Sequence, residues 1–401
     1  MPTVLLVPDL PLEGWPSMDR YAHRLHDWLE STEFGFQVRL AAHIGALTRD
    51  AGEGPPGRRK DRRKAFVRWW TQPVDPSRLV LPGPLHGPQQ WAVRYHFYPW
   101  RVKREAKRAD VVHVLDHSYA HMIASAGRRP VVVTVHDLMP VVVLRSPTDA
   151  GGWRAGVRNR VLRQALKLLR QADAYIVGTH WLKHELASWL GDDKNIHVVP
   201  FGVDRAFFGE STVARERGRR DWRIPEDAFA ILHVGSTVDR KNVPLVMQTL
   251  ARLRTQADAY LLQVGGRFTA EQEALIDRLD LRRFVRSVGG ADETTLRRAY
   301  RAADVLLFPS LYEGFGFPVL EAFASGLPVI TSGAGGLTEV GGDAAVVVDS
   351  RDPGAYVEAM ERLSDDVTER EHLVQQGWER AKTFTWQRTA AQTADVYRTI
   401  L

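Results

Sequence analysis

The 401-residue sequence contains no cysteine, which excludes disulfide bonds, thiolate metal sites and cysteine nucleophiles. It also contains no apolar run near the ~18 residues that a membrane-spanning helix needs. The first residues, MPTVLLVPDL, lack a basic segment before their apolar run, so we expect a first β-strand there, not a signal peptide. These absences are typical of a globular protein of the reducing cytoplasm.

Two further arrangements are missing. The sequence has no Asp-x-Asp triplet, which is a common way to hold a divalent metal, and no cluster of His, Asp and Glu that is typical of a metal site. We therefore predict neither a metal nor a resident cofactor. If a ligand of this protein carries phosphate, Lys, Arg and helix dipoles would therefore neutralise its charge in place of a metal.

The positive charge is unevenly distributed. The net charge is +6, but residues 51–110 alone hold 14 Lys and Arg against 5 Asp and Glu. Cations and tryptophans mix from Arg58 to Trp70 and from Trp100 to Arg108, a composition that suits an anionic membrane surface. The alternatives are a solvated basic face over core tryptophans and, ranked lower, a nucleic-acid surface, because the rest of the chain is net acidic and has no binding module.

Apolar runs alternate with helical patterns along most of the chain, which favours an α/β fold with parallel sheets. The pattern pauses around Gly202-Val203-Asp204 and then restarts, so we predict two doubly wound, Rossmann-like domains, residues 1–203 and 204–385. The expected strands are Val4–Val7, Val111–Leu115, Val131–Val135, Tyr175–Val177, Ile196–Val199, Ala230–Val234, Tyr260–Val264, Phe284–Val288, Val305–Phe308, Val329–Thr331 and Ala345–Val348. Ligands of such sheets bind beyond the carboxyl ends of the strands.

The most informative segment runs from Val305 to Val340, where Glu313 and Glu321 flank a glycine turn. The glycines allow the backbone to approach a ligand, and Pro318 suits the first turn of a helix. The free N–H groups at that helix start would attract a phosphate, and carboxylates can accept hydrogen bonds from sugar hydroxyls. The alternative is a strand–turn–helix unit in which Glu321 is a surface residue favoured by the helix dipole.

The sequence EGFGFPVLEAFASGLPVITS resembles the signature of retaining GT-B glycosyltransferases of family 4 (glycosyl transferases group 1), in which seven residues separate two glutamates. The resemblance extends from about Asp110 to the C-terminus. It implies an acceptor-binding N-terminal domain and a nucleotide-sugar-binding C-terminal domain that face a central cleft. It also implies that a last helix, within residues 386–401, packs back on the N-terminal domain.

A second motif, Arg240-Lys241-Asn242, follows the strand that ends at Val234-Gly235-Ser236. Adjacent cations suit a diphosphate, because arginine can bind it bidentately and lysine as a point charge. Alone, the motif would be an ordinary basic turn. It resembles the diphosphate clamp of the family, although Ser236 stands where the family commonly has arginine, so we expect Arg240 to supply the guanidinium.

His136-Asp137 follows another apolar strand and resembles the family's His-Asp-Leu segment, whose histidine contacts the donor sugar; a structural histidine is the alternative. The resemblance assigns catalytic roles to Glu313, His136, Arg240 and Lys241. The residues expected to bind the donor are Glu321, Gly235, Ser236, Gly316, Phe317, Pro318, Val319, Gly265 and Gly14. Those expected near the acceptor are Asp137, Trp15 and Ser17.

The resemblance therefore implies a retaining, metal-independent transferase that moves a hexose, with mannose from GDP-mannose as first choice, to an acceptor hydroxyl. UDP- and dTDP-sugars remain open. The acceptor would be a glycan or a lipid-linked sugar in the assembly of a cell-surface polysaccharide or glycolipid. The protein itself would be cytoplasmic and peripheral on the inner face of the membrane. The alternatives are a nucleotide-sugar epimerase or hydrolase of the same fold, and a non-catalytic nucleotide-sugar or nucleic-acid binding protein.

Overall fold

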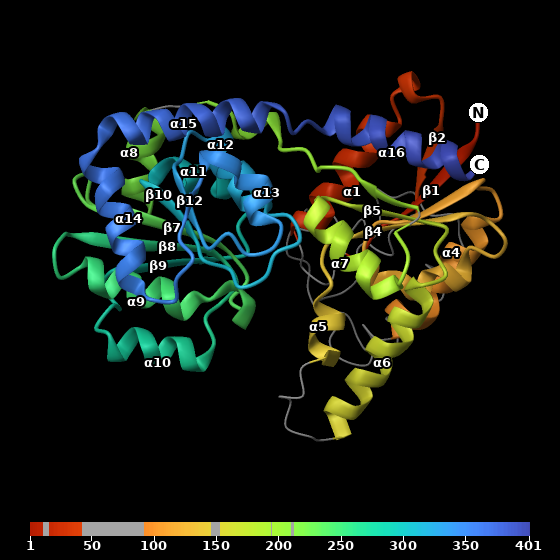
Figure 1. Cartoon of the computed structure of the whole chain (residues 1–401), viewed down its shortest axis with the longest axis horizontal. Helices are drawn as coiled ribbons and strands as arrows, with labels where there is room; N and C mark the ends of the chain where they lie inside the picture. Colours follow the sequence, from red (N-terminus) through yellow and green to blue (C-terminus); the bar gives the residue numbers. More distant parts are fainter. Residues whose placement is uncertain (11–15, 42–91, 146–152, 194, 210–211) are drawn as a thin grey trace, which may run out of the picture. The chain divides into compact units, whose positions relative to one another are not determined.

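A computed structural model describes residues 1–10, 16–41, 92–145, 153–193, 195–209 and 212–401 of the chain. These residues form two parallel sheets of six strands each (Figure 1). The first sheet has the strand order β2 (Gln37–Leu40), β1 (Thr3–Val7), β3 (Val111–Val114), β4 (Val131–Val135), β5 (Ala174–Val177) and β6 (Ile196–Val198). The second has the order β12 (Val346–Val347), β11 (Val329–Thr331), β10 (Val305–Phe308), β7 (Phe229–Gly235), β8 (Ala259–Gly265) and β9 (Val285–Gly289).

The predicted α/β class and the two doubly wound sheets are thus confirmed. Strands β4 and β10 match the expected ranges and are buried at every residue, as central parallel strands must be when helices cover both faces of the sheet. The sequence analysis missed one strand, β2. It is an edge strand, and only Val38 of its four residues is fully buried, so its apolar signal is weak.

Helices connect the strands of both sheets. Those that precede β7 are α1 (Pro16–Leu29), η2 (Thr32–Phe34), η4 (Val93–Phe97), α4 (Tyr98–Ala106), η5 (His117–Ser125), α5 (Met139–Arg145), α6 (Trp153–Leu169), α7 (His180–Leu190), η6 (Arg205–Phe207) and α8 (Thr212–Asp221). Those that follow β7 are η7 (Asp239–Lys241), α9 (Val243–Leu253), α10 (Ala270–Arg278), α11 (Glu293–Ala302), α12 (Phe317–Ala324), α13 (Leu337–Gly341), η8 (Gly342–Ala344), α14 (Pro353–Asp365), α15 (Val367–Lys382) and α16 (Trp386–Ile400).

The second sheet is enclosed between two helical layers. Helices α9 and α14 pack together on one face, and α8, α11 and α12 lie on the other (Figure 1). Apolar side chains of α9 and α14, including Val246 and Tyr356, form one core cluster with Ile231, Leu261 and Leu307 of the strands. The sheet is therefore a rigid base for the loops at its carboxyl edge.

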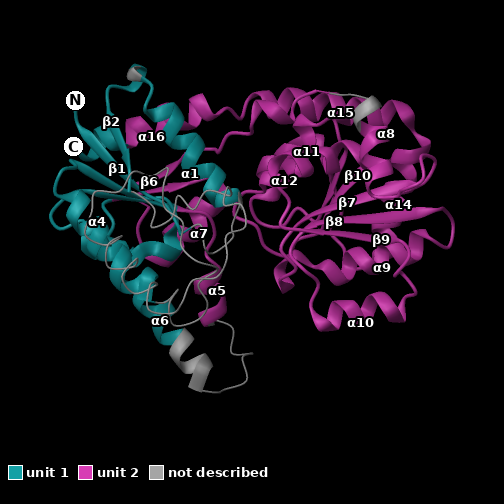
Figure 2. Cartoon of the chain, turned by 180° about the vertical axis from the view of Figure 1, so that it is seen from behind, with its two compact units in different colours: residues 1–134, 149–173, 397–401 teal, residues 135–148, 174–396 magenta. Residues whose placement is uncertain are grey.

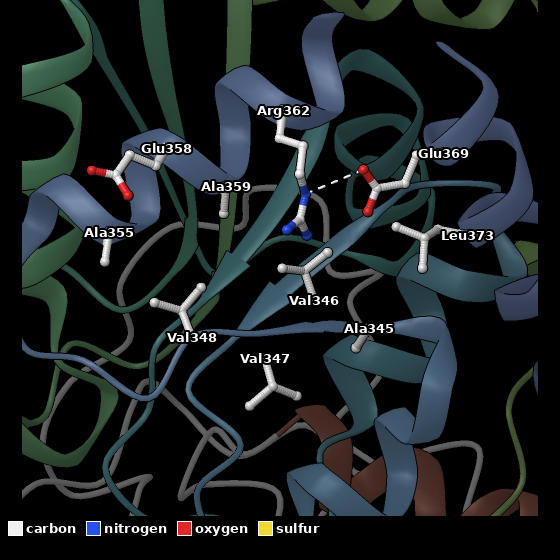
Figure 3. A pocket seen from close by; sticks show the side chains of 10 residues that line it. All are labelled: Ala345, Val346, Val347, Val348, Ala355, Glu358, Ala359, Arg362, Glu369 and Leu373. Atoms are coloured by element: carbon white, nitrogen blue, oxygen red, sulfur yellow. Dashed lines mark ion pairs between the residues drawn. The ribbon is translucent and has the colours of Figure 1, made fainter. Parts of the chain in front are cut away.

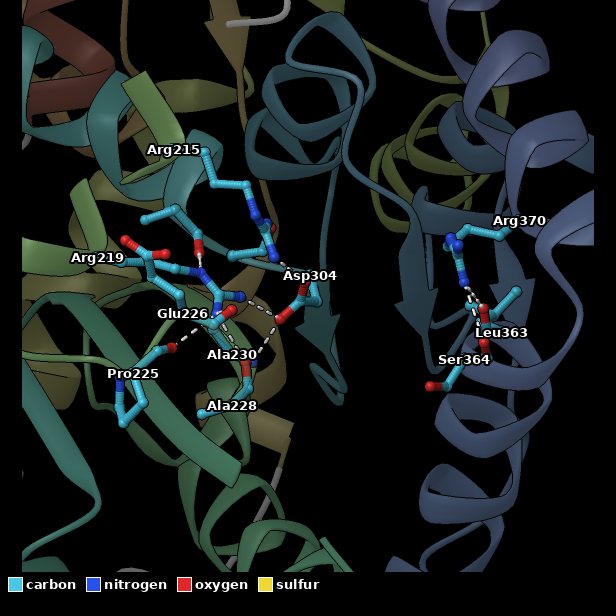
Figure 4. A network of polar contacts seen from close by, with 12 residues as sticks. Arg215, Arg219, Pro225, Glu226, Ala228, Ala230, Asp304, Leu363, Ser364 and Arg370 are labelled. Carbon is cyan, nitrogen blue, oxygen red and sulfur yellow. Dashed lines mark hydrogen bonds and ion pairs between the residues drawn. The ribbon is translucent and has the colours of Figure 1, made fainter. Parts of the chain in front are cut away.

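A buried ionic network closes the amino ends of β7 and β10 (Figure 4). Arg219 of α8 is only 1% exposed, and its guanidinium donates to Asp304 Oδ2 at 2.6 Å and to the carbonyls of Pro225, Glu226 and Ala228. Asp304 also accepts from the amide of Ala230, at 2.7 Å. Because every charge in the network has partners, its burial is tolerated. The network lies at the end of the sheet opposite the predicted ligand edge.

By its internal packing the chain divides into two compact units (Figure 2). One comprises residues 1–134, 149–173 and 397–401, and the other residues 135–148 and 174–396. Helix α16 belongs to both. Its Tyr397 hydroxyl shares a hydrogen bond of 2.7 Å with His113 in the first unit, and its Thr389 hydroxyl donates to the Pro200 carbonyl at 2.8 Å in the second. The predicted boundary at residue 204 and the separate segment 386–401 stay predictions.

Candidate functional site

The glycine turn connects the buried strand β10 to helix α12. Gly316 adopts φ 111°, which only glycine reaches without strain, and Pro318 stands in the first turn of α12. The amide of Val319 donates to Gly316 O at 3.0 Å and so already has a partner inside the turn. The helix ends before Gly326 (φ 71°), the predicted stop.

Glu313 lies at the centre of a charged cluster. It is 7% exposed, and its Oε1 lies 2.6 Å from Lys241 Nζ and 3.1 Å from Arg240 Nη1. Arg240 Nη2 lies 3.9 Å from Asp137 Oδ2. Burial lowers the pKa of the Lys241 ammonium, and the Glu313 carboxylate opposes that shift. The structure therefore brings Glu313, Arg240, Lys241 and Asp137 together.

The turn that carries the two cations is joined to the loop that carries Glu313. Asn242 takes a left-handed conformation (φ 54°), which asparagine tolerates better than most residues, and thereby ends η7 and begins α9. Its side chain donates to Pro309 O at 3.2 Å, and the amide of Leu311 donates to Arg240 O at 2.7 Å. These bonds hold both loops at the carboxyl edge of β7 and β10.

Gly235 and Gly265 make room for this arrangement. A Cβ on Gly235 would lie 3.3 Å from Lys241 Cε, and one on Gly265 would lie 2.3 Å from Gly235 O. Both residues have positive φ, 146° and 130°. They allow the ends of β7 and β8 to approach each other and leave room for the Lys241 side chain beside Gly235. Direct contact of Gly235, Ser236 or Gly265 with a donor stays a prediction.

Glu321 has a different environment. It lies in α12, is 3% exposed, and its Oε2 accepts a hydrogen bond of 2.8 Å from the Tyr300 hydroxyl of α11. It is not a surface residue stabilised by the helix dipole alone, which was the alternative considered for it. Sequence reasoning did not anticipate Tyr300.

The His136 segment packs against the glycine turn. A Cβ on Gly314 would lie 1.9 Å from His136 O, so glycine is required there. The amide of Leu138 donates to the Tyr312 hydroxyl at 3.1 Å, and burial raises the pKa of Tyr312. The His136 ring lies 5.3 Å from the ring of Phe201. Predicted residues from three strand ends, those of β4, β7 and β10, thus lie in one neighbourhood.

Comparisons with known proteins decide the family. The model for "Glycosyltransferase Family 4" matches residues 18–207, and the model for "Glycosyl transferases group 1" matches residues 214–380. A D-inositol 3-phosphate glycosyltransferase of Corynebacterium kroppenstedtii is 30% identical over 72% of this chain and 67% of its own length. The chain belongs to glycosyltransferase family 4.

Other relatives of this glycosyltransferase act on different substrates. An MMP alpha-(1->4)-mannosyltransferase of Mycolicibacterium hassiacum is 32% identical over 67% of this chain and 65% of its own length. A glycogen synthase of Mycobacterium tuberculosis is 31% identical over 72% of this chain and 69% of its own length. The chain thus spans about two thirds of the length of these relatives.

Solved structures show the fold. A sucrose-phosphate synthase of Thermosynechococcus elongatus superimposes with a TM-score of 0.73 at 22% identity, covering 100% of this chain and 99% of that one. Anabaena Alr3699/HepE, solved in complex with UDP-glucose, gives a TM-score of 0.71 at 18% identity and covers 100% of both chains. The glycosyltransferase therefore has the predicted GT-B fold.

Several site residues of the glycosyltransferase escaped the sequence analysis. Phe201, which follows β6, stacks on Phe317 with ring centroids 5.6 Å apart and also contacts Phe315 at 4.8 Å. Thr179 caps helix α7, and its hydroxyl donates to Gly314 O at 2.8 Å. A threonine directly before a helical pattern is a sequence signal for a cap, but its partner 135 positions away is not.

The structure says least about the three predicted site residues near the N-terminus. Gly14 and Trp15 lie outside the described residues, as does the basic segment from Arg58 to Trp70. Ser17 lies in the first turn of α1 and is half-buried. Their roles stay predictions.

Among the described residues, no three or more His, Asp and Glu are grouped so that they could hold a metal ion. No helix in this part of the chain is long and apolar enough to cross a membrane. A cavity of about 650 Å³ lies beside the edge strand β12 of the second sheet, between it and the helices α14 and α15 (Figure 3). It contains none of the predicted site residues, so we do not place the donor there.

Proposed function

We propose that this family 4 protein is a retaining transferase that moves a hexose from a nucleotide diphosphate sugar to an acceptor hydroxyl. The supporting observation is the convergence of Lys241 and Arg240 on Glu313 at the carboxyl edge of the second sheet. Two cations at that edge suit a diphosphate, and a carboxylate beside them suits the hydroxyls of the attached sugar. Mannose from GDP-mannose is our first choice of donor.

The reaction breaks the bond between the anomeric carbon and the diphosphate oxygen, and the electron pair leaves with the diphosphate. The acceptor oxygen bonds to the anomeric carbon, and its proton passes to the departing diphosphate. Arg240 and Lys241 would stabilise the negative charge that develops on the leaving diphosphate, so no metal is required in this proposal. Loss of one such donor commonly lowers turnover by ~10²–10³.

The two glutamates have separate roles in this proposal. Glu313 orients hydroxyls of the donor sugar and the adjacent cations, His136 contacts the sugar, and Glu321 accepts from the ribose hydroxyls. Glu321→Ala should therefore weaken nucleotide binding, whereas Glu313→Ala should mainly lower turnover. Calorimetric titration with GDP and UDP and steady-state rates would test both. Wild-type nucleotide affinity and rates in the two variants would reject the assignment.

A donor screen comes first. Thermal-shift measurements against nucleotides and nucleotide sugars should show stabilisation by one nucleotide class, because a ligand that binds the folded state raises the melting temperature. Acceptor trials with that donor should then give transfer products with the α or β configuration of the donor retained. Turnover of the donor without any acceptor would instead indicate an epimerase or hydrolase. Salt-sensitive binding of oligonucleotides alone would indicate a nucleic-acid binding protein.

We further propose that the acceptor is carried by a glycan or lipid at an anionic membrane surface, in the assembly of a cell-surface polysaccharide or glycolipid. Helices α4 and α6 both pack on η5 in the first unit. Trp100 of α4 is 48% exposed. The exposed cations of the two helices and their flanks are Lys103, Arg104, Lys107, Arg108, Arg160, Arg163, Lys167 and Arg170. Each cation adds about 1 kcal/mol near anionic lipid.

Sedimentation with phosphatidylglycerol vesicles tests this surface. We expect binding that falls with added salt and that is weakened in the double variant Lys103→Glu/Arg104→Glu. The control is Arg278→Glu/Arg283→Glu, which replaces two exposed cations of the second unit and should bind like the wild type. Equal sedimentation with neutral and anionic vesicles would contradict the membrane proposal and leave the transfer reaction untouched.

A further inference from the structure

The start of helix α7 is held by side chains from two other segments. The amides of His180 and Trp181 donate to the two carboxylate oxygens of Glu339 in α13, at 3.0 and 3.2 Å. The third amide of the helix, that of Leu182, donates to the Thr179 hydroxyl at 3.2 Å. A helix start leaves its first N–H groups without helical partners, and a carboxylate there is also favoured by the helix dipole. Glu339 thus caps a helix that begins 159 positions earlier in the chain.

The same segments hold the loop that carries Glu313. The Thr179 hydroxyl, besides accepting from Leu182, donates to Gly314 O at 2.8 Å. The amide of Gly336, one residue before α13, donates to Glu313 O at 2.8 Å. Glu313 and Gly314 are therefore fixed from two sides, by the residue that caps α7 and by the residue that precedes α13.

Close backbone approach makes this arrangement rigid. A Cβ on Gly336 would lie 2.5 Å from Gly314 O, and one on Gly335 would lie 2.3 Å from Glu313 O. Arg380 of α15 then anchors α13, because its guanidinium donates to the carbonyls of Val340 and Glu339, at 2.6 and 2.5 Å. Glu339 is thus held at its backbone by α15 while its carboxylate binds α7.

We infer that Glu339 is a positioning residue for Glu313, and that it acts through Thr179. Its carboxylate keeps the start of α7, and with it the Thr179 hydroxyl, against Gly314 O. The inference rests on the proposed catalytic role of Glu313. Loss of the Glu339 charge should displace the Glu313 loop, and a displacement of about 1 Å at a reacting centre can cost ~10²-fold in rate. Nucleotide binding through Glu321, in the next helix, should be affected little.

The experiment compares variants that differ in one property. Glu339→Gln keeps the length of the side chain but loses its charge, and Glu339→Asp keeps the charge. Thr179→Val removes the hydroxyl at equal size, and Thr179→Ser retains it. Glu371→Gln, on the exposed surface of α15, is the matched control for the loss of a glutamate charge. Turnover at saturating donor and nucleotide affinity are measured for each variant at a temperature where its melting curve shows it folded.

We expect Glu339→Gln and Thr179→Val each to lower turnover about tenfold or more, with nucleotide affinity within about threefold of the wild type. Thr179→Ser and Glu339→Asp should recover most of the loss. The double variant Glu339→Gln/Thr179→Val should lose little more turnover than either single variant, because both substitutions act on one contact. Full turnover in folded Glu339→Gln would overturn the inference, and so would strictly additive losses in the double variant.

Glu313→Ala separates this inference from the proposed function. If Glu313→Ala lowers turnover and Glu339→Gln does not, Glu313 keeps its role and the positioning by Glu339 is wrong. If Glu313→Ala retains full turnover, the assignment of Glu313 fails, and the inference about Glu339 fails with it.

Discussion

Glu313 and Glu321 belong to one motif, but the protein holds them in opposite ways. Glu313 forms ion pairs with two cations, Lys241 and Arg240, on the turn after β7. Glu321 accepts from a neutral phenol, Tyr300, inside the helical layer. A diphosphate at the first glutamate would share cations that are already in place, whereas a ribose at the second would meet a carboxylate that also accepts from Tyr300. The difference teaches that spacing in a motif does not determine the electrostatics of its members.

The largest effect should come from Lys241→Met, which removes one cation from Glu313. Taking away one partner of a buried ion pair leaves the other charge uncompensated, so we expect the free energy of unfolding to fall by about 4 kcal/mol. Urea denaturation measures it. A stability loss below about 1 kcal/mol would show that Arg240 alone compensates the charge of Glu313. Glu313 would then differ from Glu321 by one cation and not by two.

Acid should lower the stability of the fold through His233 of β7, whose charge would interact with those of Lys241 and Glu313. Burial lowers the pKa of His233 to about 4, while its bond to Gln263 raises it and the Lys241 charge lowers it. Between about pH 6.5 and 4 the unfolded chain therefore binds a proton that the folded chain does not. The free energy of unfolding falls by about 3 kcal/mol as the pH is lowered through that window. We expect His233→Gln to flatten the stability curve there by that amount. Parallel curves for the variant and the wild type would contradict this.

Tyr300→Phe examines the other glutamate. It removes the hydroxyl that donates to Glu321, and because hydrogen bonds to charged acceptors contribute about 1.5–3 kcal/mol, we expect a stability loss of about 2 kcal/mol. Nucleotide affinity should fall while turnover at saturating donor is retained. Titration calorimetry and steady-state kinetics give the two values. A fall in turnover with unchanged affinity would remove the distinction between the two glutamates.

The smallest effect should come from Lys382→Met, the exposed counterpart of the Lys241 variant. Lys382 lies 2.7 Å from Glu379, but the two side chains are 47% and 57% exposed. Surface pairs contribute about 0–1 kcal/mol, so the stability loss should stay below about 1 kcal/mol. Equal losses for Lys241→Met and Lys382→Met would show that burial does not set the strength of the Glu313 pair.

Most of the sheet strands could be predicted because their evidence is local. The run Val305–Phe308 is apolar at every position and Val131–Val135 at every position except Thr134, and a proline adjoins each, Pro309 and Pro130. Strand β2 was missed since it lies at a sheet edge with one fully buried residue. The glycine turn before α12 was predicted for the same local reason, because Gly316 permits a positive φ and Pro318 fixes its own φ.

The sequence by itself determined which residue types stand at the strand ends, because apolar runs, helical patterns and the backbone preferences of glycine and proline act over a few residues. Only the tertiary structure decided which of them meet. The order of the strands brings Lys241 to Glu313, 72 positions away, and Thr179 to Gly314, 135 positions away. Such contacts depend on how whole strands and helices pack, and no local preference of either residue encodes its partner.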